Sequence, residues 1–76
     1  MNEKKLIQTM LKRKKTVGER LRLLRADIGW TQKFAAEMMN IPERRYQGLE
    51  YGENCRDERK KVVADAFGVD VMDIWR

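Results

Sequence analysis

Apolar residues recur along this chain at spacings of three and four, the period of an α-helix with one buried face. The clearest stripe, which Gly29 follows as a helix stop, consists of Val17, Leu21, Leu24 and Ile28. Another helix begins at Asn54 or Asp57 and ends before Gly68, and its inward residues are Val62, Val63, Ala66 and Phe67. No segment alternates at period two, so the pattern predicts an all-α fold. The apolar residues expected to close the core are Val71, Ile74 and Trp75.

Capping residues stand where these helices begin. Thr16 is followed three residues later by Glu19, which is the pattern of a capping box and predicts a helix start just after Thr16. Thr31 is placed to cap a helix over residues 32–39, and Asp70 to cap a short final turn.

The segment Trp30–Gly52 predicts two short helices joined by a tight turn. Its inward set consists of Ala35, Ala36, Met39, Ile41, Tyr46 and Leu49. Ala36 is small where the two backbones approach, and Asn40 tolerates the left-handed conformation of a sharp reversal. Pro42 opens the second helix, about residues 42–51, with its φ preset. Such a pair is the helix-turn-helix arrangement, which lays its second helix in the major groove of DNA.

The same segment resembles the helix-turn-helix of the phage-repressor/Cro and XRE-type regulators. The residues that carry the resemblance are Thr31, Gln32, Ala36, Ile41, Tyr46, Leu49, Glu50 and Gly52. It runs from about residue 17 to residue 74. It implies a five-helix, lambda-repressor-like bundle over residues 16–76, preceded by a basic arm or extra helix over residues 1–15. It also implies a homodimer on double-stranded DNA.

The first turn of the second helix in such a pair faces base edges in the major groove. Arg44 can donate two hydrogen bonds to guanine, Gln47 can pair with adenine, and Glu43 can accept from cytosine N4. The resemblance places base readers at these three positions and at Gly48, which has no side chain to read with. Without the resemblance, the charges of this turn are those of a solvated helix face.

Contacts to the DNA backbone are expected around the two helices. The N-terminus of the helix that Thr31 caps presents amides and a partial positive charge. The expected backbone contacts are Thr31, Gln32, Lys33, Arg45, Tyr51 and Arg56. Glu53, in the loop after Gly52, weakens the case for a strong loop contact. The resemblance also pairs Arg25 with Glu50 in a partly buried ion pair between the first and third family helices, which is structural rather than a DNA contact.

The N-terminal segment holds the entire excess of positive charge. The net charge is +5, and residues 1–16 contain six basic side chains and one acidic one, whereas residues 17–76 contain eleven of each. Its basic run is Lys12, Arg13, Lys14 and Lys15. The segment is either a flexible arm that reaches DNA, a solvated tail, or a helix over residues 2–13 that docks through Leu6, Ile7, Met10 and Leu11. Phe34 and Met38 form an apolar strip suited to receive that face, unless Phe34 fills the body's own core.

Composition excludes several classes of protein. Cys55 is the single cysteine, so no internal disulfide forms and a reducing compartment is expected. The chain has no histidine, and we expect no metal site, no cofactor and no enzymatic activity. No apolar run is long enough to span a membrane.

We therefore expect a small sequence-specific transcriptional regulator in the cytoplasm, of bacterial, phage or prophage origin. Seventy-six residues leave no room for a sensing domain, so repression by occupying a promoter is favoured over ligand-gated activation. The alternative is an interaction module, such as an antitoxin or antirepressor. Its partner would bind the Phe34/Met38 strip or the apolar face within residues 6–11.

Overall fold

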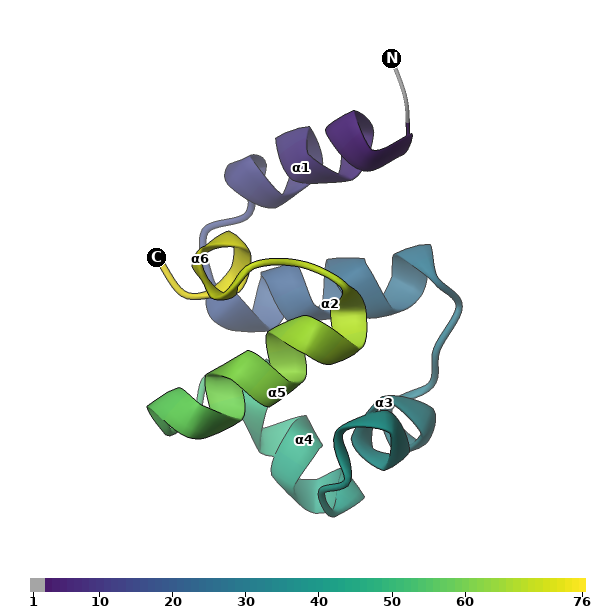
Figure 1. Cartoon of the computed structure of the whole chain (residues 1–76), viewed down its shortest axis with the longest axis vertical. Helices are drawn as coiled ribbons and strands as arrows, with labels where there is room; N and C mark the ends of the chain where they lie inside the picture. The colour runs from purple at the N-terminus through teal and green to yellow at the C-terminus, as the bar shows by residue number, and fades with distance from the viewer. Residues whose placement is uncertain (1–2) are drawn as a thin grey trace.

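The computed structural model describes the backbone of residues 3–76 and the side chains of residues 6–76. This part of the chain contains six helices and no strand (Figure 1), which confirms the all-α class. The helices are α1 (Glu3–Arg13), α2 (Val17–Asp27), α3 (Gln32–Met39), α4 (Glu43–Glu50), α5 (Asp57–Phe67) and α6 (Val71–Ile74). None of these helices has the length and apolar composition needed to cross a bilayer.

Local signals set the ends of these helices. The Thr16 hydroxyl accepts a hydrogen bond from the backbone N–H of Glu19 at 3.1 Å, and the Thr31 hydroxyl accepts one from that of Phe34 at 3.0 Å. These bonds satisfy first-turn amides that have no partner within the helix. Gly68 ends α5 in the left-handed conformation, with φ of 71°. Sequence patterns were therefore sufficient to locate most helix ends.

All six helices contribute to the buried core. Its members are Leu11, Leu21, Leu24, Ala35, Ala36, Met39, Tyr46, Leu49, Val63, Ala64 and Ile74. Two predicted core residues are wrong, because Ile28 and Val62 are each 45% exposed. Ile28 is the residue that follows the last turn of α2, so the helix no longer turns it inward. On α5 the buried positions are taken by Val63 and Ala64 instead.

Helix α1 docks on the body rather than forming a flexible arm. Leu11 is 1% exposed and belongs to the core, and Ile7 packs against it, whereas Leu6 is 53% exposed. α1 packs on α6 and α2, and in Figure 1 it lies at the opposite end of the long axis from α3 and α4. The expectation that Phe34 and Met38 receive this helix is therefore wrong.

Arg20 holds the connection between α1 and α2 in place. Its guanidinium donates to the backbone carbonyls of Lys14 at 3.1 Å, Lys15 at 3.3 Å and Ile74 at 2.6 Å. The side chain is buried, and this burial, together with the nearby Arg76, lowers the pKa of Arg20. Arg76 in turn donates to the carbonyl of Leu11 at 2.7 Å. Two arginines thus bind α1, the following linker and α6 to one another.

Candidate nucleic-acid interface

The turn between α3 and α4 aims the second helix outward. Asn40 adopts the left-handed conformation, with φ of 57° and ψ of 44°. The N–H of Ile41 donates to the carbonyl of Ala36 at 3.0 Å, which closes the end of α3. Pro42 is extended and stands just before α4, which begins at Glu43. The predicted left-handed asparagine is confirmed, and Pro42 precedes the helix rather than opening it.

The first turn of α4 projects from the molecule while the other face of the helix is buried. Tyr46 and Leu49 anchor that inner face, at 0% and 2% exposure. The exposed residues of the first turn are Pro42, Glu43, Arg44 and Arg45. Among the side chains of residues 6–76, the ion pairs are Arg25–Glu50 and Lys60–Asp57. Neither arginine of the turn is therefore neutralised within this part of the chain.

A buried ion pair fixes α4 to α2. Arg25 Nε donates to Glu50 Oε2 at 2.7 Å and its Nη2 donates to Oε1 at 3.2 Å, the pairing that the family resemblance implied. Arg25 also donates to the carbonyl of Trp30 at 3.1 Å, which ties the α2–α3 loop to the pair. The carboxylate side chain is 1% exposed and that of the arginine 21%.

This pairing sets the ionisation of the buried groups. Burial raises the pKa of Glu50, but the interactions with Arg25, Tyr46 and Gln32 outweigh it and hold the pKa below its ordinary value. The hydrogen bond to Glu50 raises the pKa of Arg25. Burial, followed by the nearby carboxylate, raises the pKa of Tyr46, whose hydroxyl has no well-aligned hydrogen-bond partner among the described residues.

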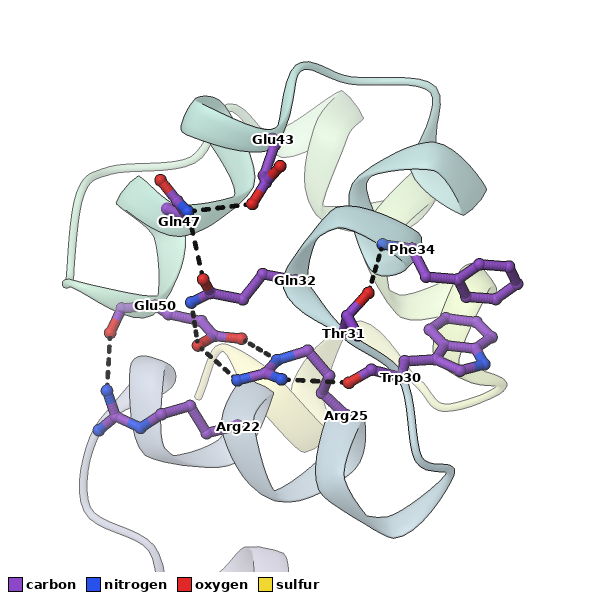
Figure 2. Close-up of polar contacts among 9 residues, drawn as sticks. All are labelled: Arg22, Arg25, Trp30, Thr31, Gln32, Phe34, Glu43, Gln47 and Glu50. Carbon is purple, nitrogen blue, oxygen red and sulfur yellow. Dashed lines mark hydrogen bonds and ion pairs between the residues drawn. The ribbon is translucent and has the colours of Figure 1, made fainter.

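A chain of amide side chains connects this ion pair to the exposed turn (Figure 2). Gln32 Nε2 donates to Glu50 Oε1 at 3.1 Å, and Gln47 Nε2 donates to Gln32 Oε1 at 3.2 Å. The same Gln47 nitrogen donates to Glu43 Oε2 at 3.2 Å. Both N–H groups of Gln47 are thus engaged inside the protein, so pairing with adenine requires it to exchange at least one of these bonds.

The other residues predicted to contact the DNA backbone lie on several elements. Thr31 uses its hydroxyl to cap α3, and Lys33 in the first turn of that helix is exposed. Tyr51, at the C-terminal end of α4, is 79% exposed. Thr16 and Tyr51 line one hollow of about 500 Å³, so the start of α2 approaches this end of α4. The remaining basic residues Lys12 and Arg13 belong to the last turn of α1.

A second group of arginines, only partly foreseen, gathers beside α4. Arg45, Arg56 and Arg59 line a hollow of about 420 Å³ together with Leu49, Asn54 and Cys55. Arg59 was missed, although it lies in the first turn of α5, three residues after Arg56, which immediately precedes the helix. The Cys55 thiol donates to the carbonyl of Arg56 at 3.6 Å, and burial raises the pKa of this thiol. The hollow is suited to an anion such as a backbone phosphate.

Gly48 and Glu53 meet at the end of α4, an arrangement that sequence reasoning did not find. The N–H of Glu53 donates to the carbonyl of Gly48 at 2.9 Å, and a side chain on residue 48 would collide with the Glu53 carboxylate. Gly48 is buried for this reason. The signal that was available is Gly52, since a glycine just past a helix end turns the next residue back over the last turn.

Comparisons of the chain with protein-family models, with curated proteins and with solved structures find no match.

Proposed function

We propose that this chain is a small sequence-specific DNA-binding regulator of the helix-turn-helix type, with a lambda-repressor-like bundle over residues 16–76. The observation that carries the proposal is the first turn of α4. Two unneutralised arginines, Arg44 and Arg45, project from a helix whose opposite face is anchored by Tyr46 and Leu49. A helix presented in this way suits the major groove.

Base reading is assigned to Glu43, Arg44 and Gln47. Arg44 leads, because a guanidinium contacts the O6 and N7 of guanine with two hydrogen bonds and nothing in the described part of the chain neutralises it. Gln47 and Glu43 are bonded to each other in the free protein. They are therefore positioned before DNA arrives but exchange bonds when they read a base.

Phosphate contacts complete the interface and give most of the affinity. The residues assigned to this role are Thr31, Gln32, Lys33, Arg45, Tyr51, Arg56 and, from the structure, Arg59. Gln32 bonds to both Glu50 and Gln47, so its role includes fixing α3 against α4. The buried pair Arg25–Glu50 has a structural role only.

The proposed assembly is a homodimer in the cytoplasm of a bacterium, encoded by the host or by a phage or prophage. Two copies of α4 would enter successive major grooves about 34 Å apart. A dimer seated on a promoter represses by occupying it.

Selection of bound sequences from a random pool of DNA duplexes tests this function. The full chain is expected to enrich a motif and to bind it at least about 10³-fold more tightly than a scrambled duplex at the same salt concentration. Titrations at several salt concentrations should give a log–log slope of about −0.9 for each phosphate contacted. Equal affinity for selected and scrambled duplexes would contradict the proposal.

A second candidate, a protein-interaction module such as an antitoxin or antirepressor, is favoured by the apolar strip on α3. Phe34 is 43% exposed and Met38 is 53% exposed. The Phe34 ring packs edge-on against Trp30, with ring centroids 5.2 Å apart, which keeps it fixed at the surface. The DNA selection separates the two functions, because an interaction module enriches no sequence.

A further inference from the structure

The end of α4 returns the chain over the helix it has just left. Gly52 is left-handed, with φ of 96°. Its N–H donates to the carbonyl of Leu49 at 3.2 Å, and that of Glu53 donates to the carbonyl of Gly48 at 2.9 Å. These are the two hydrogen bonds of a Schellman motif, in which the residue after the glycine contacts the third residue from the helix end. Here those residues are Glu53 and Gly48.

The Glu53 carboxylate fills the space where a side chain on residue 48 would stand. A Cβ built on Gly48 meets both carboxylate oxygens and the carbon between them, and no other atom is nearer. Gly48 lies one helical turn after Arg44 and next to Gln47, on the part of α4 assigned to base reading. Residue 48 of the helix thus has no side chain, and the side chain of Glu53, from the following loop, occupies its place.

The carboxylate lies beside the leading base reader. Glu53, Pro42, Arg44 and Arg45 line one open hollow of about 310 Å³. No ion pair joins Glu53 to either arginine among the side chains of residues 6–76. The hollow is therefore lined by guanidinium donors and by a carboxylate acceptor. Two neighbouring base pairs can present the matching groups in the major groove, the two acceptors of a guanine in one pair and the N4 amino donor of a cytosine in the next.

We infer that Glu53 is a base-reading residue, accepting a hydrogen bond from cytosine N4 in place of a side chain at position 48. The cytosine belongs to the base pair next to the one whose guanine Arg44 contacts, because both side chains line the same hollow. This inference rests on the proposed function and adds to it a specificity determinant outside α4.

Selection from a random duplex pool is carried out with the full chain and with Glu53→Ala, Glu53→Gln and Gly48→Ala. Gly48→Ala is the decisive variant, because its methyl group displaces the carboxylate without removing it. Alanine also favours the helix, so α4 is retained. Circular dichroism and thermal unfolding confirm folding of each variant.

The wild-type chain is expected to select cytosine at one position, by roughly fivefold to 100-fold over the other bases. Glu53→Ala and Gly48→Ala should both lose this preference at that position and keep the guanine selected by Arg44. Glu53→Gln should weaken it, since an amide is a poorer acceptor than a carboxylate. The double variant Gly48→Ala/Glu53→Ala should select as Glu53→Ala does.

Two results would overturn the inference. One is an unchanged motif in Glu53→Ala with tighter binding to every duplex, which makes Glu53 only a charge that repels phosphate. The other is loss of preference in Glu53→Ala but an unchanged motif in Gly48→Ala. A wild-type chain that enriches no motif is a different failure, because it overturns the proposed function itself.

Discussion

Arg25 and Glu50 differ in burial within the ion pair that joins α2 to α4, so removing one or the other should cost different amounts of stability. The Glu50 side chain is 1% exposed, whereas that of Arg25 is 21% exposed and reaches water. Arg25→Met leaves a buried carboxylate that keeps the hydrogen bond from Gln32 but has no cation beside it, and is expected to destabilise the fold by about 3–5 kcal/mol. Glu50→Gln should cost less, about 1–3 kcal/mol, because the freed guanidinium can be hydrated. Urea unfolding of both variants measures the difference, and equal costs would contradict this assignment of burial.

The lowered pKa of Glu50 makes part of the stability depend on pH. In the folded chain this pKa lies below the value of about 4.3 expected for an unfolded glutamate, so the unfolded chain binds the proton more readily. The stabilisation is fully present above that unfolded value. It is lost as pH falls through the folded pKa. Unfolding free energies measured from pH 7 to pH 2 should therefore decline more steeply for the wild type than for Glu50→Gln. Parallel profiles would show that other carboxylates dominate acid unfolding.

Arg44 is expected to carry sequence preference rather than general affinity. Arg44→Ala should weaken binding to the selected duplex by about 1–3 kcal/mol and relax preference at one base pair, with a smaller effect on scrambled DNA. Competition titrations with the two duplexes measure this. A loss of equal size on both would assign the guanidinium to a phosphate.

Single residues show where sequence reasoning succeeded at the candidate site and where it stopped. Asn40 and Thr31 were predictable because their roles depend on neighbours within five residues. The family resemblance supplied Arg25 and Glu50, which are twenty-five residues apart. Arg20 was missed because an arginine that bonds only to backbone carbonyls leaves no complementary residue type to find. Arg20 is buried only because α2, α6 and the linker after α1 pack around it.

Among the helices, α1 shows most clearly what sequence leaves undecided. Its amphipathic pattern was readable, but the pattern does not say which surface receives it. α1 packs on α2 and on α6, where Gln8 donates to Asp73 at 3.3 Å, and not on α3. That outcome depends on where the C-terminal residues fold back. The wrong predictions for Ile28 and Val62 have the same cause. An apolar stripe on a helix can be longer than the surface that neighbouring helices cover, so some of its residues stay exposed.

Docking of α1 predicts that this helix supports stability. Leu11→Ala should destabilise the fold by about 2–4 kcal/mol, because Leu11 is buried in the shared core. Leu6→Ala is the matched control on the same helix, since Leu6 is 53% exposed and should change stability by less than about 1 kcal/mol. Thermal unfolding compares the two. If both variants unfold as the wild type does, α1 is not part of the cooperative unit.

The whole molecule separates its excess charge from its proposed reading surface. All of the net charge of +5 lies in residues 1–16, whereas α1 and α4 lie at opposite ends of a molecule about 36 Å long (Figure 1). The arginines near α4 belong to a region that is neutral overall. The position of each basic side chain, rather than the total charge, should therefore determine which of them neutralise phosphates.

A pair of substitutions with the same change in charge tests this separation. Arg59→Gln removes a positive charge from the arginine hollow beside α4, and Lys12→Gln removes one from the last turn of α1. Arg59→Gln should weaken binding to every duplex and reduce the magnitude of the salt slope by about 0.9, the value for one lost phosphate contact. Lys12→Gln should change the slope far less, because Lys12 acts only through a field that salt screens within about 10 Å at 0.1 M. Fluorescence anisotropy titrations between 50 and 200 mM salt, within the range where such slopes are about linear, give both values. Equal slopes for the two variants would mean that the charge of the whole chain attracts DNA and that the hollow holds no phosphate.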